Sequence, residues 1–234
     1  MTGTIGIIGA MEVEVEQLVG LLEDGHATTV SGMTFHEGTL GETQVVIVRC
    51  GVGKVSAAMC AQTLIDRFGA EQVINTGVAG SLDASLDIGD LVVSTDAVQH
   101  DMDVTGLGYP PGHVPELDKL EFDASDELRA VVCKAAAEVA PDTTVVEGRV
   151  ASGDQFVITQ GQRDFIISTF GASCCEMEGA AIAHVCHRND VPFVIVRAIS
   201  DKADGTSVVE YRVFEREAAH HCAAIVRRAV ELLA

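Results

Sequence analysis

The segment from Asp190 to Asp201 constrains the fold of this chain more than any other stretch. Its first part, 191–196, is a nearly continuous run of β-branched and aromatic residues, which is typical of a strand buried on both faces. Arg197 interrupts the run, and Ser200 and Asp201 end it. Polar groups at the carboxyl end of a buried strand lie where open α/β sheets bind their ligands. The segment therefore predicts a central strand with a ligand site at its end; the alternative is a structural ion pair between Arg197 and Asp201.

The core that surrounds such a strand must be built from aliphatic side chains. Hydrophobic residues make up 47% of the 234 residues, whereas aromatic residues make up 4% and Trp is absent. A chain of this length buries a large core, and small aliphatic side chains suit a parallel or mixed sheet covered by helices. We expect one α/β domain over residues 1–234.

Charge and cysteine content narrow the classes of function. The formal net charge of −20 disfavours nucleic acid and anionic membranes as partners. Seven cysteines without a Cys-x-x-Cys pair predict neither a disulfide framework nor a zinc site. No signal-peptide pattern opens the chain and no apolar run reaches membrane-spanning length, so we expect a cytoplasmic protein with reduced thiols.

Strand and helix patterns alternate along the chain, which indicates a layered α/β fold. Strands are predicted at 4–8, 33–37, 44–50, 72–76, 91–95, 144–152, 173–176 and 191–196, and helices at 11–22, 55–67, 125–139, 160–170, 177–188 and 209–233. A tight turn is expected at 77–80. The aperiodic stretch 96–123 contains three prolines and predicts a functional or interface loop, or else a surface loop folded over its own domain.

Two further patterns are weak on their own. The glycines at 51–53, followed by Lys54, open a predicted helix but lack the spacing of a phosphate-binding loop. His184 and His187 lie three residues apart on a predicted helix, but no third ligand is evident, so we expect no metal.

Five motifs stand in order along the chain: Gly-Ile-Ile-Gly-Ala-Met-Glu at 6–12, Asn-Thr-Gly-Val-Ala-Gly at 75–80, Ser-Gly-Asp at 152–154, Glu-Met-Glu at 176–178 and Val-Arg-Ala-Ile-Ser-Asp at 196–201. Together they resemble the 5′-methylthioadenosine/S-adenosylhomocysteine nucleosidases, members of the nucleoside phosphorylase superfamily. The resemblance extends from Ile5 to about Phe214. It implies a three-layer α/β/α sandwich around a central mixed, partly barrel-like sheet, a nucleoside substrate, no cofactor, and a homodimer.

The resemblance also implies how the N-glycosidic bond is cleaved. Asp201 matches the general acid at adenine N7, a role that suits a carboxylic acid whose pKa is raised by burial. Glu14 matches the group that orients and activates the water, and Arg197 helps to hold that water. The alternative for Glu14 is an ordinary charge in the first turn of a helix, where acidic residues favour the helix dipole.

Other positions match the family's binding residues. Glu178 is implied to accept hydrogen bonds from the ribose hydroxyls, Met177 to pack on the sugar, and Phe156 to stack on adenine, although such a Phe is often simply part of a core. The Val157 backbone is implied to read the base edge, and Ser200 to support Asp201. The remaining expected pocket residues are Glu176, Ala79, Gly80, Met11, Val52 and Tyr211.

Some residues depart from the family pattern or depend on a second subunit. Val78 stands where serine is common, Tyr211 where Phe is common, and Val157 where Ile is common, which leaves the preferred 5′-substituent open. Within the aperiodic stretch, Leu107 and Tyr109 are expected to line the pocket of the partner subunit.

Three other functions remain open at the level of sequence. A futalosine or aminodeoxyfutalosine hydrolase would share the same motifs. A nucleoside phosphorylase would need a cationic clamp for phosphate, and the loop 51–54 offers only Lys54. A non-catalytic nucleoside-binding module would be expected to lack one of the acid–base carboxylates, and none is missing.

Overall fold

The computed structural model describes residues 3–203 and 207–234. Its strands are β1 (Thr4–Gly9), β2 (Glu23–Val30), β3 (Met33–Leu40), β4 (Thr43–Arg49), β5 (Ala70–Ser81), β6 (Leu91–Gln99), β7 (Glu121–Asp123), β8 (Val145–Ser152), β9 (Cys174–Glu176) and β10 (Phe193–Asp201). Its helices are α1 (Glu12–Gly20), α2 (Lys54–Phe68), α3 (Asp126–Val139), α4 (Gln160–Phe170), α5 (Gly179–Arg188) and α6 (Ser207–Leu232), with short 3₁₀ turns at Thr105–Leu107 and Pro115–Leu117.

The strands form one mixed sheet, part of which closes on itself. β5 pairs with β10, β10 with β6, β6 with β8, β8 with β9, and β9 again with β5, so that five strands make a closed barrel. The series β1, β4, β3 and β2 extends the sheet from β5, and β7 pairs with β6. The predicted mixed and partly barrel-like sheet is confirmed.

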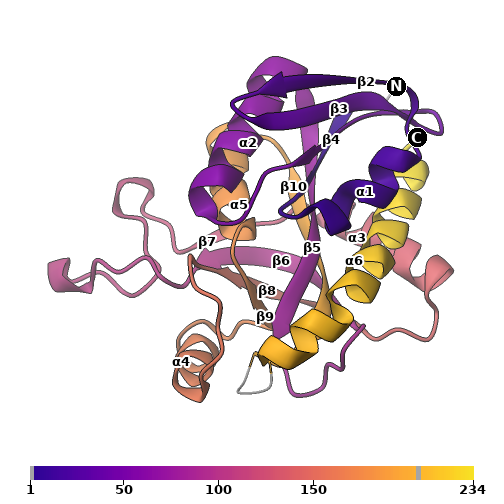
Figure 1. The fold of residues 1–234 in the computed structure, drawn as a ribbon. Helices are drawn as coiled ribbons and strands as arrows, with labels where there is room; N and C mark the ends of the chain where they lie inside the picture. The colour runs from indigo at the N-terminus through magenta and orange to yellow at the C-terminus, as the bar shows by residue number, and fades with distance from the viewer. Residues whose placement is uncertain (1–2, 204–206) are drawn as a thin grey trace.

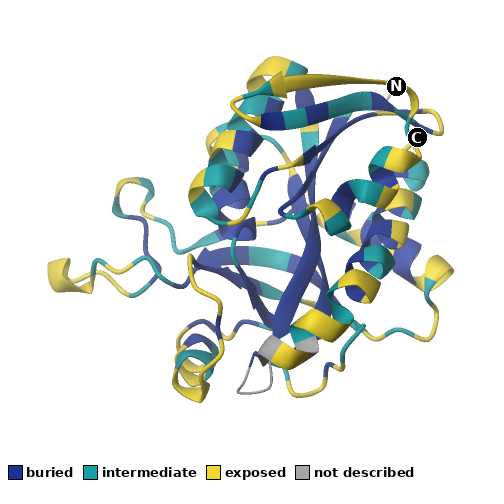
Figure 2. Ribbon diagram, viewed as in Figure 1, coloured by how far each residue is buried: buried dark blue, intermediate teal, exposed yellow. Residues whose placement is uncertain are grey.

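Helices cover both faces of this sheet (Figure 1). α2 and α5 pack together on one face, whereas α1, α3 and α6 lie on the other. Each side has its own aliphatic core, and Figure 2 shows the central strands, such as β5, almost entirely buried between them. The predicted three-layer arrangement is therefore confirmed. It arises because strands that are apolar on both faces need a helical layer on each side.

The segment from Asp190 to Asp201 contains a central strand of the barrel, β10, as predicted. β10 runs from Phe193 to Asp201, and every one of its residues is buried. It lies between β5 and β6. The strand continues through Arg197, so its charged residues belong to the strand itself.

One prediction about the strands is wrong, and one strand was not predicted. The expected tight turn at 77–80 is part of β5, which continues to Ser81 and pairs along its whole length. β2 was not predicted because nearly all of its residues are exposed, and its polar sequence has no apolar alternation. The length of β5 matters for the fold, since its first half pairs with β1 and its last residues pair with β9.

The expected boundaries of two other segments also change. β6 continues to Gln99 and β7 occupies Glu121–Asp123, so the irregular stretch is shorter than 96–123. This stretch projects from the body of the molecule in Figure 1. α5 begins at Gly179, which leaves Met177 and Glu178 in the turn between β9 and the helix.

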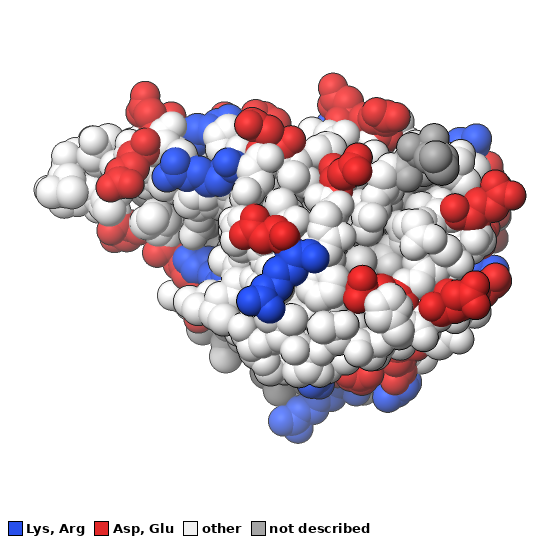
Figure 3. Space-filling model, turned by 90° about the horizontal axis from the view of Figure 1, so that it is seen from above, with Lys and Arg blue, Asp and Glu red and all other residues white. Residues whose placement is uncertain are grey.

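The surface reflects the acidic composition. Acidic side chains are spread over the face shown in Figure 3, with basic side chains between them. None of the helices in the described part of the chain is long and apolar enough to cross a membrane.

The start of α3 allows a direct test of the local sequence signals. The Ser125 hydroxyl accepts a hydrogen bond from the backbone N–H of Leu128, as expected for an N-cap. We predict that Ser125→Ala lowers the free energy of unfolding by about 1 kcal/mol in urea denaturation, whereas Ser125→Asp, which retains a capping oxygen, leaves it nearly unchanged. Equal stability of the two variants would contradict a capping role.

Candidate active site

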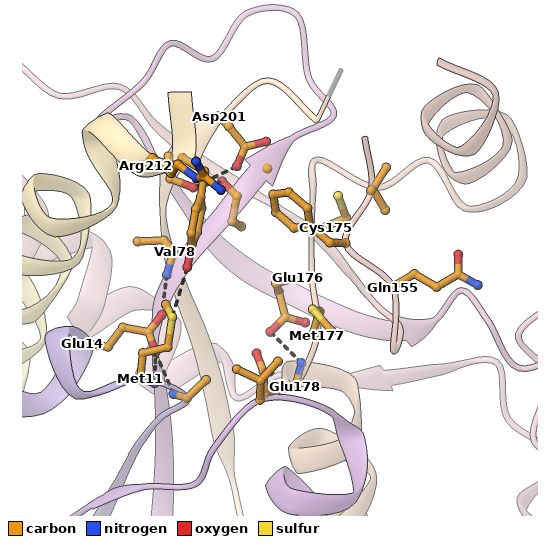
Figure 4. Close-up of a pocket in the computed structure, with 18 residues that line it drawn as sticks. Met11, Glu14, Val78, Gln155, Cys175, Glu176, Met177, Glu178, Asp201 and Arg212 are labelled. Carbon is orange, nitrogen blue, oxygen red and sulfur yellow. Dashed lines mark hydrogen bonds between the residues drawn. The ribbon is translucent and has the colours of Figure 1, made fainter. Parts of the chain in front are cut away.

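One large cavity, of about 450 Å³, opens at the end of the barrel and collects most of the predicted site residues (Figure 4). It is lined by Ala10, Met11, Glu14, Val52, Val78, Ala79, Gly80, Gln155, Phe156, Val157, Cys175, Glu176, Met177, Glu178, Ser200, Asp201, Tyr211 and Arg212. Every expected pocket residue lies here except Arg197, Leu107 and Tyr109.

The strand ends of the barrel bring these residues together. β5 and β10 run in parallel with Ile199 opposite Ala79, and a shift in register then sets Asp201 opposite Gly80. β9 ends on Glu176, and β1 leads into the turn before α1. Because the carboxyl ends of parallel strands meet at one edge, residues far apart in the sequence line the same cavity.

Glu14 is held in the first turn of α1 by backbone N–H groups. Its Oε2 accepts from Ala10 (2.6 Å) and Met11 (2.9 Å), and its Oε1 accepts from Val78 in β5 (3.1 Å). The side chain is buried. Burial raises the pKa of this carboxyl, and the charge of Arg197 together with the three N–H groups opposes that rise. Glu14 is thus more than a solvated helix charge, because it links α1 to β5 and lines the cavity.

Arg197 lies beneath the cavity and does not line it. Its side chain is completely buried and forms an ion pair with Glu176. Its guanidinium also donates to Asn75 Oδ1 (2.6 Å) and to the carbonyl of Thr76 (3.1 Å). Arg197 was expected among the pocket residues and does not line the cavity, since its hydrogen bonds go to β5 and β9. Its expected help in holding the water stays a prediction. The alternative, an ion pair with Asp201, is replaced by the pair with Glu176.

Glu176 completes this buried network. The carboxylate also accepts from the Ser152 hydroxyl and from the backbone N–H groups of Glu178 (3.2 Å) and Gly179 (2.8 Å). It therefore neutralises Arg197 and caps the start of α5 at the same time. Although Glu176 reaches the cavity wall, its oxygens are directed to protein groups.

Glu178 lies beside this network with fewer partners. Its Oε1 accepts from the backbone N–H of Gly53 (2.8 Å), and its Oε2 lies 3.9 Å from Arg197. Burial and the neighbouring charge of Glu176 raise the pKa of Glu178 to about 7, against the opposing effects of Arg197 and the Gly53 N–H. Glu178 therefore has hydrogen-bonding capacity left for a ligand.

Asp201 lies at the opposite end of the cavity from Glu14 and Glu178 (Figure 4). The side chain is buried, its Oδ2 accepts from the Ser200 hydroxyl (3.0 Å), and its Oδ1 accepts from the backbone N–H of Ala203 (2.9 Å). The supporting contact expected of Ser200 is thus present.

Aromatic side chains lie at the mouth of the cavity. Phe156 and Tyr211 meet edge to face with their ring centroids 5.6 Å apart. The Tyr211 hydroxyl lies within hydrogen-bond distance of two acceptors, Met11 Sδ (3.1 Å) and Glu215 Oε1 (3.1 Å), and can donate its one proton to either. Phe156 remains 43% exposed, so it is not simply part of a core, whereas Val157 is buried. The cavity thus combines flat apolar walls with buried carboxylates, as binding of a flat polar molecule requires.

The sequence did not single out five of the lining residues: Ala10, Val78, Gln155, Cys175 and Arg212. Each is next to a residue that was predicted, so adjacency at a strand end was the available signal. Val78 was noted only as a departure from the family pattern. Burial raises the pKa of the Cys175 thiol well above its usual value, which makes a thiolate nucleophile there unfavourable.

Leu107 and Tyr109 lie outside the cavity, on the projecting stretch. Leu107 is 76% exposed, and Tyr109 stacks on His113 with a centroid separation of 4.8 Å. Their expected place in a partner's pocket stays a prediction.

The paired histidines of α5 have packing partners. His184 stacks on Phe122 (4.9 Å between centroids), and His187 lies at a tilt to the same ring (5.6 Å). In residues 3–203 and 207–234, no group of three His, Cys, Asp or Glu side chains is arranged to hold a metal ion.

Comparison with known proteins identifies the class to which this fold and cavity belong. The sequence profile of the phosphorylase superfamily matches residues 4–231, so the chain belongs to that superfamily. Within it, the chain belongs to the 5′-methylthioadenosine/S-adenosylhomocysteine nucleosidases. A protein of that name from Treponema pallidum is 44% identical over 98% of this chain and 93% of its own length.

Solved structures agree with this assignment. The nucleosidase from Neisseria meningitidis in complex with methylthio-immucillin-A is 37% identical, covers 98% of this chain and 99% of its own, and superimposes with a TM-score of 0.95. A futalosine hydrolase mutant from Helicobacter pylori is 34% identical, covers 99% of this chain and all of its own, and has a TM-score of 0.94. The resemblance found in the sequence is confirmed.

The buried ion pair beneath the cavity gives a prediction about stability. Glu176→Gln leaves the charge of Arg197 buried without its main counter-charge, so we expect a loss of about 3–5 kcal/mol in the free energy of unfolding. As a control, Glu121→Gln removes an exposed partner of Arg149 and should cost at most about 1 kcal/mol. Urea denaturation measures both, and equal losses would contradict the role given to Glu176.

Proposed function

We propose that this protein hydrolyses the N-glycosidic bond of 5′-methylthioadenosine and S-adenosylhomocysteine, releasing adenine and the 5-thio-substituted ribose. The observation that carries the proposal is the meeting of Glu14, Glu178 and Asp201 in one cavity, with Asp201 facing the other two across it. Membership of the nucleosidase family, over nearly the whole chain, supports it.

The proposed reaction is acid–base catalysis and needs no cofactor. Asp201, in its protonated form, donates a proton to N7 of adenine as the bond between C1′ and N9 breaks and its electron pair passes to the purine. The ribose then carries an oxocarbenium-like charge. Water adds to C1′, and its proton passes to Glu14, whose three N–H donors hold the carboxylate in place. Arg197 acts indirectly, by fixing Glu176 beneath the cavity.

The remaining lining residues bind the two halves of the substrate. Glu178 accepts hydrogen bonds from the ribose hydroxyls, which its free capacity beside Gly53 allows. Met177 packs on the sugar, Phe156 stacks on adenine, and the Val157 backbone reads the base edge. A site built to pair with hydroxyl groups rejects analogues that lack them, because a buried charge is then left unpaired.

The surroundings of Lys54 favour water over phosphate as the nucleophile. Lys54 Nζ lies 2.5 Å from Asp101 and is directed away from the cavity. The Gly53 N–H, which opens α2 and is suited to an anion, donates to Glu178. Arg212 is the only cation among the described lining residues, and it is exposed. A phosphorylase would need a cationic clamp that these residues do not supply.

A futalosine or aminodeoxyfutalosine hydrolase is the second candidate, supported by the likeness to the Helicobacter pylori futalosine hydrolase. Incubation with methylthioadenosine, S-adenosylhomocysteine and futalosine, with and without phosphate, distinguishes the candidates when free base is followed by chromatography. Phosphate-independent release of adenine from the first two substrates supports the proposal. Release that requires phosphate would contradict it.

The proposed general acid gives the next prediction. Asp201→Asn cannot transfer the proton that the leaving adenine needs, so we expect a loss of roughly 10²–10⁴-fold or more in kcat for methylthioadenosine with the fold intact. Glu14→Gln should also lose turnover but still bind nucleoside in calorimetric titration. Near-native turnover of Asp201→Asn would remove this residue from the mechanism.

We also propose that the protein acts as a homodimer in which the stretch carrying Leu107 and Tyr109 completes the partner's pocket. Both residues are apolar and more than one-third exposed. Val52 before α2, and Val55 and Met59 four residues apart on α2, are exposed apolar residues as well. Exposed large apolar side chains of this kind are often covered at an interface.

The dimer proposal predicts a linked change in assembly and kinetics. Replacing Leu107 and Tyr109 together by Asp should raise KM for methylthioadenosine and shift the protein toward monomer in light scattering. Val139→Asp, at an exposed apolar position on α3, is the control for an added surface charge. A double variant that stays dimeric with unchanged kinetics would contradict the proposal.

We further propose a cytoplasmic location, which the state of the thiols supports. All seven cysteines are free, and most are buried. Disulfides are rare where glutathione and thioredoxin keep thiols reduced. We therefore place the proposed reaction in the cytoplasm.

A further inference from the structure

Three residues behind the cavity bind one another in a closed cycle, which we call the loop clasp: Lys54, Asp101 and Asp154. Lys54 Nζ lies 2.5 Å from Asp101 Oδ1. Asp101 Oδ2 accepts from the backbone N–H of Asp154 (2.9 Å), and Asp154 Oδ1 accepts from the backbone N–H of Lys54 (2.8 Å). None of the three lines the catalytic cavity.

Two members of the clasp adjoin segments that do line it. Lys54 follows Gly53, whose N–H donates to the carboxylate of Glu178. Asp154 precedes the lining segment 155–157, which contains Phe156. The clasp therefore joins the loop that holds the carboxylate on the sugar side to the loop that carries the aromatic ring on the base side.

The clasp is itself attached to regular structure. Lys54 Nζ also donates to Gln99 Oε1 at the end of β6 (3.2 Å), and Gln99 Nε2 lies 3.3 Å from His184 Nδ1 on α5. The loop after β8 is further restricted because a Cβ at Gly153 would overlap the ring of His100. The side chains of Lys54 and Asp101 are only 19% and 15% exposed, so water screens their attraction weakly.

We propose that Lys54 and Asp101 are positioning residues, which fix the separation between Glu178 and Phe156 so that ribose and adenine are held in one productive pose. The inference rests on the proposed nucleosidase function. The competing view is an ion pair that only stabilises the fold. Misplacement of a reactant by about 1 Å can cost on the order of 10²-fold in rate, so a positioning role has a measurable kinetic effect.

The first test removes one partner of the Lys54–Asp101 ion pair at a time. Lys54→Met removes the ammonium group but keeps the stem and the backbone N–H, and Asp101→Asn replaces one acceptor oxygen by an amide nitrogen. We expect each to lower kcat/KM for methylthioadenosine by roughly 10–100-fold. The double variant should be no worse than the more affected single variant, because both act on one unit.

Matched controls separate this effect from a loss of charge or of folding. Lys134→Met and Asp142→Asn make the same changes at exposed positions and should leave kcat/KM within about twofold, as is usual at surface sites. Lys54→Arg, which keeps a cation opposite Asp101, should recover most of the activity. Folded clasp variants with kcat/KM within twofold of the parent would overturn the proposal.

The pH profile distinguishes positioning from an electrostatic effect through space. Glu178 faces the Gly53 N–H, Glu176 on β9, Arg197 on β10, and Glu14 on α1. The Gly53 N–H favours the charged form of Glu178, so a loosened loop raises the pKa of Glu178 and moves the acid limb of the kcat/KM profile to higher pH.

A positioning role and a direct effect of charge therefore predict different patterns of pKa shift for Glu178 in the two variants. If the loops loosen, Lys54→Met and Asp101→Asn both move the acid limb to higher pH. If charge alone acts, removing the cation in Lys54→Met raises the pKa of Glu178, whereas removing the anion in Asp101→Asn lowers it. The acid limbs of the two variants then move in opposite directions. Opposite shifts would overturn the proposal.

A binding measurement keeps this test independent of the proposed reaction. If the parent protein releases no adenine from methylthioadenosine, the proposed function fails, and calorimetric titration with methylthio-immucillin-A then tests the clasp. We expect binding at least about tenfold weaker in Lys54→Met than in the parent, since Phe156 and the Glu178 carboxylate held by Gly53 both line the cavity that would receive the ligand. Equal affinity in the two proteins would overturn the inference.

Discussion

The buried ion pair between Arg197 and Glu176 is the interaction on which the rest of the site depends. A fully buried guanidinium is costly unless its charge is balanced and most of its N–H groups are paired; here Glu176 balances the charge, and Asn75, Thr76 and Glu176 accept from the two terminal nitrogens, whereas Nε has no hydrogen-bond partner. These partners come from β9 and β5, so the pair connects three strands of the barrel. Gly77 makes the approach possible, because a Cβ there would overlap both Arg197 Nη1 and Glu14 Oε1.

This cation allows three carboxylates to be buried near one another. Glu14, Glu176 and Glu178 each raise the pKa of Arg197 above its usual value against the effect of burial, and Arg197 in turn lowers the cost of charging Glu14 and Glu178. The balance leaves both glutamates with raised pKa values, which suits the general-base role proposed for Glu14. Arg197, which the family resemblance suggested helps to hold the water, thus acts on the carboxylates from beneath the cavity.

Much of the fold was predictable because its signals are local. The apolar run of β10 and the helix that Ser125 caps each depend on neighbouring residues, and they appear in the structure. Most of the site was predictable too, since motifs at strand ends mark ligand-binding positions whatever the strand order. The exposed, polar β2 gave no local signal, because it forms only by pairing with β3.

The sequence by itself determined the α/β class, the family and most of the residues that line the cavity, because these follow from periodicity and from motifs within a few residues. Only the tertiary structure decided that β5 runs through Gly77 and Gly80 to meet β9 and close the barrel, that Arg197 pairs with Glu176, and that Lys54 pairs with Asp101. From the sequence alone, Arg197 and Lys54 could each pair with any of many carboxylates. The choice is made by strand register and by burial, which depend on contacts between residues far apart in the chain.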